Sequence, residues 1–350
     1  MIAADRPVQR PPQAKLLVID ADGHINHACR STVVDFLRPG DLLIANDAAT
    51  LPASLQGLHL SSKAAIEVRL AGRHSLASND VSHFSAVVFG EGDFCTRTED
   101  RLPPPPLAPG DRLALGPLSA TVERLIDHPR LVALHLDGSP DEIWSGLARH
   151  GRPIQYAHIR SPLALWDVWA PIAGPPVAFE PPSAGFALDW QTLLAIRERG
   201  VEFATLTHAA GISSTGDEEL DRHLPFDEPY YIPAVTAAAI CRTRARGGRV
   251  VAVGTTVVRA LEHAAMQDGQ VRSGEGVATQ RIDEATLLQV VDAILSGTHE
   301  PGTSHYQLLR AFVDDATLCR ASEEMDLLGY RTHEFGDSIL IERQAHRTAG

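Results

Sequence analysis

Short apolar runs, each broken by Gly, Pro or Asp, fill the first half of the chain. The runs at residues 15–20 and 42–46 predict buried strands, because a short apolar run bounded by turn residues is typical of a strand. Three further runs, at 66–70, 86–89 and 131–136, follow at intervals typical of a small β-barrel or meander. The first half is therefore predicted to be mostly β-structure.

The second half alternates helices and strands with recognisable ends. Ser139, Pro140 and Glu142 have the order of a capping box with a proline in the first turn. Gly200 and Gly247 follow later helical patterns as stop signals. This alternation predicts a layered, mainly parallel α/β sheet. The elements expected there are helices at 190–199, 233–246 and 256–266 and strands at 201–207 and 249–253.

The composition narrows the class of protein. The 350 residues suffice for two domains, and the 44% hydrophobic and 21% charged fractions are typical of globular proteins. A net charge of −13 excludes the broad basic surface of a dedicated nucleic-acid binder, so any RNA contact needs a local basic groove. No stretch approaches the ~18 apolar residues of a membrane helix, and residues 1–13 lack the apolar core of a signal peptide. We therefore expect a cytoplasmic protein without membrane contact.

The four cysteines are widely scattered along the chain, and no two of them form a CxxC pair. Their spacing argues against a zinc site or a disulfide framework, so we expect buried free thiols. They are Cys29, Cys95, Cys241 and Cys319.

The richest segment for chemistry is 249–262, where a buried strand turns at one glycine into a helix that we expect to be capped by hydroxyls. Gly254 permits a backbone conformation or a close approach that a Cβ would forbid. Thr255 and Thr256 then offer hydroxyls and free amides at a helix N-terminus, where a carboxylate or a ribose hydroxyl can bind. An ordinary capped turn is the alternative interpretation.

This segment, with the sequence RVVAVGTTVVRALE, resembles the GRVIAVGTT-x-VR-x-LE signature of the S-adenosylmethionine:tRNA ribosyltransferase-isomerases of queuosine biosynthesis. Other family stretches follow in the same order. His223, Glu228 and Tyr230 have the spacing of its H-x-MH-x-E-x-Y motif. Residues 39–57, 181–188, 290–301 and 329–341 resemble PGDLLVVNDTRVIPARL, APTAGLHF, VDxLITNFHLP and YRFFSYGDAMLI respectively.

The resemblance implies an α/β fold with a small inserted β-barrel, which we place as a larger domain at 1–60 and 150–350 and a smaller one at 61–149. It also implies a transferase-isomerase reaction. The ribose of S-adenosylmethionine passes to the aminomethyl group of a 7-deazaguanine at the tRNA wobble position, and adenine and methionine are released. S-adenosylmethionine is then the co-substrate, and no metal is implied.

Several polar residues of the family stretches are absent. Ala49 and Ser54 stand where the family has arginine, Pro11 and Pro12 replace an Arg-Asp pair, and Ala187 replaces a histidine. Because guanidinium groups bind carboxylates and phosphates bidentately, their loss puts tRNA in more doubt than S-adenosylmethionine. A small-molecule acceptor, or a non-catalytic nucleoside-binding protein on the same fold, are the alternatives.

The implied chemistry needs a base for a proton on the 5′ carbon and an acid for the departing adenine, which suits groups titrating near neutrality. His208, His223 and His299 stand where the family has histidine. Glu228 could orient one of them or act as an acid. With 16 histidines in the chain, a packing or surface role is the alternative for each.

The binding residues are predicted around the ends of the strands. Asn46 and Asp47 follow a buried strand and could bind ligand hydroxyls, or they could form an ordinary turn. Arg259 could bind the methionine carboxylate, or it could pair with Glu262 along one helix face. The oligomeric state is left open. The full predicted set is Asn46, Asp47, Ser183, Gly185, Gly254, Thr255, Thr256 and Arg259.

Overall fold

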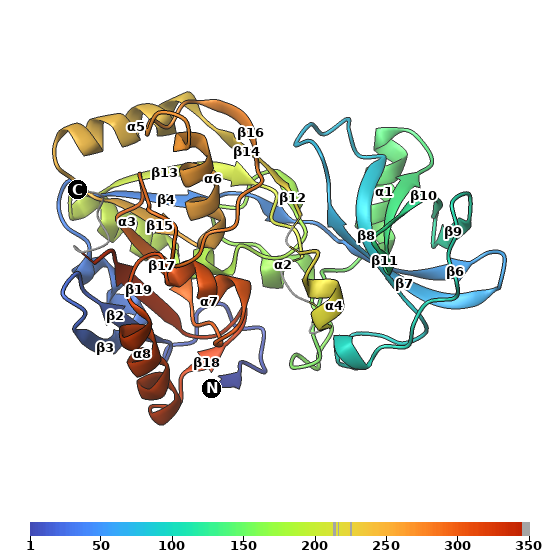
Figure 1. Cartoon of the computed structure of the whole chain (residues 1–350), viewed down its shortest axis with the longest axis horizontal. Helices are drawn as coiled ribbons and strands as arrows, with labels where there is room; N and C mark the ends of the chain where they lie inside the picture. Colours follow the sequence, from blue (N-terminus) through green and yellow to red (C-terminus); the bar gives the residue numbers. More distant parts are fainter. Residues whose placement is uncertain (213–214, 216, 225, 345–350) are drawn as a thin grey trace.

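The computed structural model describes residues 1–212, 215, 217–224 and 226–344. The chain forms two lobes, a β-barrel and a larger layered α/β lobe (Figure 1). The predicted combination of an α/β domain with a small β-barrel is confirmed. The division into domains at 61–149 and at 1–60 with 150–350 stays a prediction.

The barrel is closed by six antiparallel strands in the order β10-β11-β8-β7-β6-β9. Helix α1 (Pro140–His150) packs beside β10, and its first turn has the predicted capping box of Ser139 and Glu142. The three apolar runs of the first half lie in β7, β8 and β11 and fill the barrel interior. The strands are β6 (Ser54–His59), β7 (Ala64–Gly72), β8 (His83–Phe89), β9 (Arg112–Leu115), β10 (Leu118–Ile126) and β11 (His128–Leu136).

The α/β lobe is built on nine strands in the order β16-β14-β13-β4-β15-β17-β19-β2-β3. Its centre, from β13 to β17, is parallel, and β2 and β19 are also parallel, whereas both edges are antiparallel. The strands are β2 (Lys15–Ile19), β3 (Ile25–Cys29), β4 (Leu42–Asn46), β13 (Glu202–His208), β14 (Glu228–Ile232), β15 (Val250–Val253), β16 (Gly274–Ala278), β17 (Ala293–Gly297) and β19 (Ser338–Glu342).

Both faces of this sheet are covered, which explains the continuous apolar runs of its central strands. In β4, Leu42 and Ile44 pack under α5 (Ala234–Ala245) and α6 (Thr255–Ala265), whereas Leu43 and Ala45 point to the opposite face. That face is covered by α3 (Trp190–Glu198) and the 3-10 helix η1 (Arg30–Phe36). Parallel strands with helices on both faces place ligand sites at their carboxyl ends.

Shorter elements complete the chain. The cysteines were expected to be buried, which is wrong: all four are free thiols exposed to solvent. No helix in the described part of the chain is both long and apolar enough to span a bilayer. The remaining elements are α2 (Leu165–Val168), α4 (Glu218–Asp221), α7 (Ser304–Leu309), α8 (Asp315–Leu327), η2 (Thr98–Asp100), η3 (Ser183–Ala187), β1 (Ile2–Ala3), β5 (Ala49–Thr50), β12 (Pro176–Ala178) and β18 (Arg331–Thr332).

Candidate functional site

A cavity of about 1120 Å³ lies at the carboxyl ends of the central strands. The barrel lobe contributes Arg97 and Thr98 to its wall, and the α/β lobe contributes the joint between β15 and α6. The cavity therefore faces both lobes. Of the predicted site residues, it is lined by Ser183, Glu228, Gly254, Thr255, Thr256, Arg259 and His299.

The joint between β15 and α6 has the backbone that the sequence predicted. Gly254 has a φ of +93°, which residues with a Cβ rarely adopt, and an added Cβ would lie 3.4 Å from the Cβ of Ala184 in η3. The expectation of a hydroxyl cap is wrong, because Gly254 is itself the N-cap and no side chain in the described residues caps this end. The first-turn amides of α6 are therefore available to an anion in the cavity.

The loop that contains Ser183 and Gly185 lies against this joint through Ala184. Ser183 lines the cavity, whereas Gly185 is buried behind it. An added Cβ at Gly185 would meet only the Cβ of Ala170, at 3.5 Å. Gly185 thus supports the loop from behind.

Arg259 forms a buried charged group with Glu228 and His208. Its Nη1 donates to Glu228 Oε2, and its Nη2 donates to the carbonyl of Ala278 at 3.1 Å. Glu228 Oε2 also lies 3.5 Å from His208 Nε2. The alternative that paired Arg259 with Glu262 is wrong, because the Glu262 carboxylate accepts the backbone N–H groups of Gln289, Val290 and Val291.

The charges and hydrogen bonds within this group compensate the burial of its members only in part. Burial raises the pKa of Glu228, and the Arg259 cation and a 2.6 Å hydrogen bond from the Gly211 amide offset that effect only in part. Burial, followed by the charge of Arg259, lowers the pKa of His208 well below its ordinary range. Within the described residues, both ring nitrogens of His208 and the Nε of Arg259 have no hydrogen-bond partner. Unsatisfied buried polar atoms beside a cavity are typical of a functional site.

His299 also lines the cavity, two residues beyond the end of β17. Its Nε2 lies 2.8 Å from Ser296 Oγ, and its ring stacks on His305 with centroids 4.8 Å apart. Burial lowers the pKa of His299 well below its ordinary range, and His305 and His333 add to the effect. Burial and then Arg259 lower the pKa of His305 to about 4. Both imidazoles are therefore neutral at neutral pH.

Asn46 and Asp47 lie behind the cavity wall. The Asn46 Oδ1 accepts from the amides of His208 and Ala48, at 3.0 Å each, and its Nδ2 donates to the His208 carbonyl and, at 3.4 Å, to Thr256 Oγ1. Asp47 Oδ1 accepts from Thr207 Oγ1 at 2.7 Å. Both side chains thus tie β4 to its neighbours, and neither lines the cavity.

His223 lies apart from this group. It follows α4, and its ring packs against His128 of β11 with centroids 6.2 Å apart. Like His208, His223 does not line the cavity. The structure thus brings His299 to the cavity wall, places His208 behind Glu228 and leaves His223 near the barrel.

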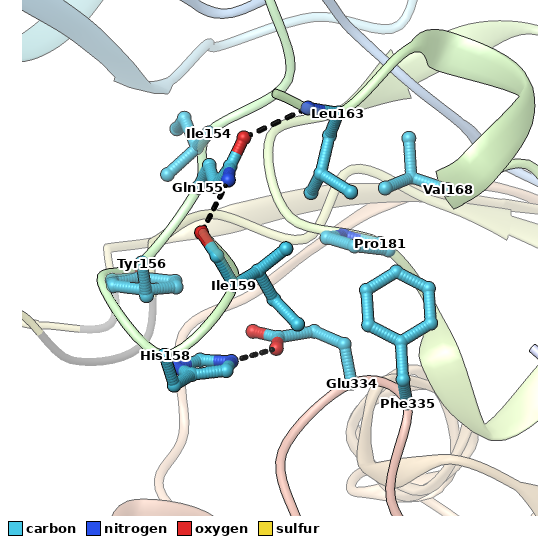
Figure 2. A pocket seen from close by; sticks show the side chains of 10 residues that line it. All are labelled: Ile154, Gln155, Tyr156, His158, Ile159, Leu163, Val168, Pro181, Glu334 and Phe335. Atoms are coloured by element: carbon cyan, nitrogen blue, oxygen red, sulfur yellow. Dashed lines mark hydrogen bonds and ion pairs between the residues drawn. The ribbon is translucent and has the colours of Figure 1, made fainter. Parts of the chain in front are cut away.

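Several cavity residues were missed by sequence reasoning. His158, His305, His333 and Glu334 all line the cavity. Figure 2 shows His158 and Glu334 turned toward each other from separate loops. A repeated tripeptide was the available signal, since Thr-His-Glu occurs at 298–300 and again at 332–334. The two copies lie together, and Thr298 Oγ1 donates to the carbonyl of Arg331 at 2.6 Å.

Comparison with known sequences identifies relatives of this chain. Residues 1–341 match the model of a family described as queuosine biosynthesis protein. A protein of Pelobacter propionicus named S-adenosylmethionine:tRNA ribosyltransferase-isomerase is 31% identical, with 97% of this chain and 96% of the relative covered. A protein of the same name from Citrifermentans bemidjiense is 33% identical, with the same shares covered.

A solved structure has a similar fold. The crystal structure of an S-adenosylmethionine tRNA ribosyltransferase from Thermotoga maritima superposes with a TM-score of 0.51 at 23% identity. The match covers 97% of this chain and 96% of that one. At this identity the likeness concerns the fold, and it includes both lobes.

Proposed function

The chain belongs to the queuosine biosynthesis protein family, and from this premise we propose that it is an S-adenosylmethionine:tRNA ribosyltransferase-isomerase, the activity named for its relatives. The resemblance drawn from the sequence motifs is confirmed. We further propose that the chain acts in the cytoplasm, as expected of an enzyme that modifies tRNA. The observation that carries the proposal is the 1120 Å³ cavity in which the start of α6, the Arg259–Glu228 pair and His299 face one space.

The start of α6 is proposed to hold the methionine carboxylate of S-adenosylmethionine. The positive end of a helix dipole and its free first-turn amides favour an anion. Thr255 and Thr256 line the cavity beside those amides. Arg259, one turn further on, lies next to the same space, and its Nε has no hydrogen-bond partner among the residues that the structure describes. Glu228 fixes the orientation of Arg259, and His208 acts on it from behind as a positioning residue.

His299 is proposed as the base. Its neutral imidazole accepts the proton from the 5′ carbon beside the sulfonium, and Ser296 Oγ orients the ring. The electron pair left on the 5′ carbon expels the ring oxygen from the 4′ carbon, and that oxygen expels adenine from the 1′ carbon, so adenine leaves as its ring nitrogen takes up a proton. The acceptor amine bonds to the 4′ carbon and gives up a proton, and the electron pair that returns to the 5′ carbon bonds it to the 1′ carbon. The oxygen then closes an epoxide on the 5′ carbon as methionine leaves with the electron pair of the carbon–sulfur bond. Each transfer therefore releases one adenine and one methionine.

The acceptor is proposed to be tRNA, as the names of the relatives state for those proteins. The cavity wall includes the exposed Arg97 on the barrel side and Arg281 and Arg310 on the other. Arg97 pairs with Glu99, and Arg310 pairs with Glu284 and Asp315. An RNA contact needs a local basic groove in this acidic chain, so RNA phosphates would have to replace those carboxylates. The arginines missing at Ala49 and Ser54 make this the part of the proposal that most needs a direct assay.

The test incubates the full chain with S-adenosylmethionine and tRNA carrying the aminomethyl deazaguanine, and chromatography measures adenine and methionine. Equal amounts of both, formed only with the modified tRNA, support the proposal. Release with the free aminomethyl deazaguanine base but not with tRNA would show a small-molecule acceptor. A thermal shift with S-adenosylmethionine but no product under any condition would show a binding protein.

A separate variant tests the assignment of His299 as the base. Asparagine at His299 retains a polar group near Ser296 but cannot take a proton, so His299→Asn should lower kcat by roughly 10²–10⁴-fold with little change in KM. His83→Asn, in a half-exposed histidine of the barrel, is the matched control and should leave kcat unchanged. A KM effect without a kcat effect would assign His299 to binding.

A further inference from the structure

Two histidines and a glutamate meet on the cavity wall away from α6. His158 Nε2 lies 3.2 Å from Glu334 Oε2, and the rings of His158 and His333 stack with centroids 4.4 Å apart. Each of the three residues offers one ligand atom, and all three atoms lie within 4.8 Å of one another. Figure 2 shows His158 and Glu334 facing each other beside a small apolar pocket. The mechanism proposed above uses none of these three groups.

This spacing is close to what a tetrahedral ion requires. Ligand atoms about 2.0–2.2 Å from zinc lie roughly 3.3 Å from one another, so the His158–Glu334 pair already has the needed separation. The third atom must move inward by about 1.5 Å at most. His333 is exposed, so its side chain is free to make that movement.

The backbone and the protonation states also suit a ligand set. His333 has a φ of +68°, a conformation that residues other than glycine rarely adopt and that clusters at functional sites. Burial alone would raise the pKa of Glu334, but the hydrogen bond and charge of His158 outweigh it and lower that pKa. Because metal ligands must be deprotonated, a bound ion would take the place of the proton between His158 Nε2 and Glu334 Oε2.

We propose that His158, His333 and Glu334 bind a divalent transition-metal ion of the zinc class in the wall of the cavity. Two imidazoles and one carboxylate are a donor set that suits zinc and disfavours magnesium or calcium. Three protein ligands leave the fourth position open toward the cavity, which the same residues line. The expectation of no metal rested on cysteine spacing and on family resemblance, and neither of these takes account of the histidines that the fold assembles.

The experiment titrates Zn²⁺ alone into the full chain by isothermal calorimetry, after treatment with a chelator and removal of that chelator. The four exposed thiols are first blocked with iodoacetamide, because free cysteines also bind zinc. We expect one equivalent to bind saturably. Glu334→Gln and His333→Ala should each weaken that binding at least about tenfold, since even outer-shell changes cost about 10–100-fold. Co²⁺ in place of Zn²⁺ should give visible absorption bands of a tetrahedral site.

The control is His24→Ala. His24 belongs to the exposed group Asp20, Asp22 and His24, whose ligand atoms are similarly close, and its loss should leave the tight equivalent unchanged. Circular dichroism checks that every variant is folded. No saturable binding, or binding that survives both Glu334→Gln and His333→Ala, would overturn the proposal. The titration contains neither S-adenosylmethionine nor tRNA, so its result is independent of the transferase assay.

Discussion

Each lobe contains a glutamate that is buried against arginine, Glu67 in the barrel and Glu228 in the α/β lobe, and the two groups behave in opposite ways. In the barrel, Glu67 accepts from Arg69 Nε at 2.7 Å and from Arg101 Nη1, and both guanidinium groups lie over the ring of Phe89. In the α/β lobe, the cation that pairs with Glu228 is Arg259, and that arginine faces the cavity. The Glu67 group is therefore enclosed by packed side chains, whereas the Glu228 group faces the cavity on one side.

The pKa shifts express this difference. Burial would raise the pKa of Glu67, but the charges and hydrogen bonds of Arg69 and Arg101 outweigh it, and the pKa falls below its ordinary value. For Glu228 burial prevails over the single Arg259, and the pKa rises. Two cations therefore fix a permanent carboxylate, whereas one cation leaves a carboxyl group that can take up a proton. The first arrangement serves stability and the second suits a reaction site.

The largest expected effect is on stability, at Glu67→Gln. The change leaves the Arg69 and Arg101 cations buried without a counter-charge, which should lower the free energy of unfolding by about 3–5 kcal/mol. Urea unfolding measures it. Glu123→Gln removes an exposed ion pair with His83 on the same barrel and should cost less than ~1 kcal/mol. Equal costs for the two variants would contradict a stabilising role for the buried group.

Glu228→Gln should have the reverse profile. Glutamine can still accept from the Gly211 amide, but it presents an N–H to Arg259, so the guanidinium loses its orientation. We expect kcat/KM for adenine release to fall about 100-fold, equivalent to ~2.7 kcal/mol. The free energy of unfolding should change by less than ~2 kcal/mol, because cavity water can solvate Arg259. If Glu228→Gln lowers the free energy of unfolding but retains kcat/KM, Glu228 has the same stabilising role as Glu67.

The site around Glu228 also shows what could and what could not be predicted from the sequence. The strand at 42–46 was predicted to the residue, and so was the glycine that needs a positive φ at 254, because apolar runs and turn glycines act locally. The partner of Arg259 was not predicted. Helical spacing favoured Glu262, but Glu228, 31 residues away, wins because sheet pairing brings β14 beside the carboxyl end of β13.

Long-range assembly also explains the misplaced and missed histidines. Motif spacing pointed to His223, yet the chain after α4 carries that ring toward the barrel. His158 and His333 are 175 positions apart, and no local pattern links them before the fold does. The antiparallel edges of the sheet escaped prediction for the same reason, since strand order depends on crossovers that the apolar pattern does not encode.

A smaller effect should appear in the pH dependence of stability. The folded pKa of Glu67 is below 4.5, so its contribution is present above pH 4.5 and is lost as the pH falls through the folded value. The folded pKa of Glu228 is above 4.5, so its contribution is present below pH 4.5 and is lost as the pH rises through the folded value. Urea unfolding of the wild type and both glutamine variants, from acid to neutral pH, measures the differences.

The deficit of Glu67→Gln should therefore shrink on acidification below pH 4.5. Glu228→Gln should gain stability relative to the wild type as the pH rises above 4.5, because the glutamine cannot ionise. Parallel pH curves for the two variants would show that both carboxyl groups have the same environment and would remove the basis of the comparison.

The smallest effect should come from the backbone at the open site. Gly254→Ala forces a Cβ into a φ of +93° at 3.4 Å from the Ala184 Cβ, which should cost about 1–2 kcal/mol of stability. It also shifts the first-turn amides of α6, so the Kd for S-adenosylmethionine should rise about fivefold, or ~1 kcal/mol. Thermal melts and calorimetric titration measure both. Gly297 lines the same cavity, and a Cβ added there would lie 3.9 Å from its nearest neighbour, the Cε1 of His299. Gly297→Ala should therefore change neither the stability nor the Kd. If the two variants bind S-adenosylmethionine with equal Kd, the N-terminus of α6 does not contact this ligand.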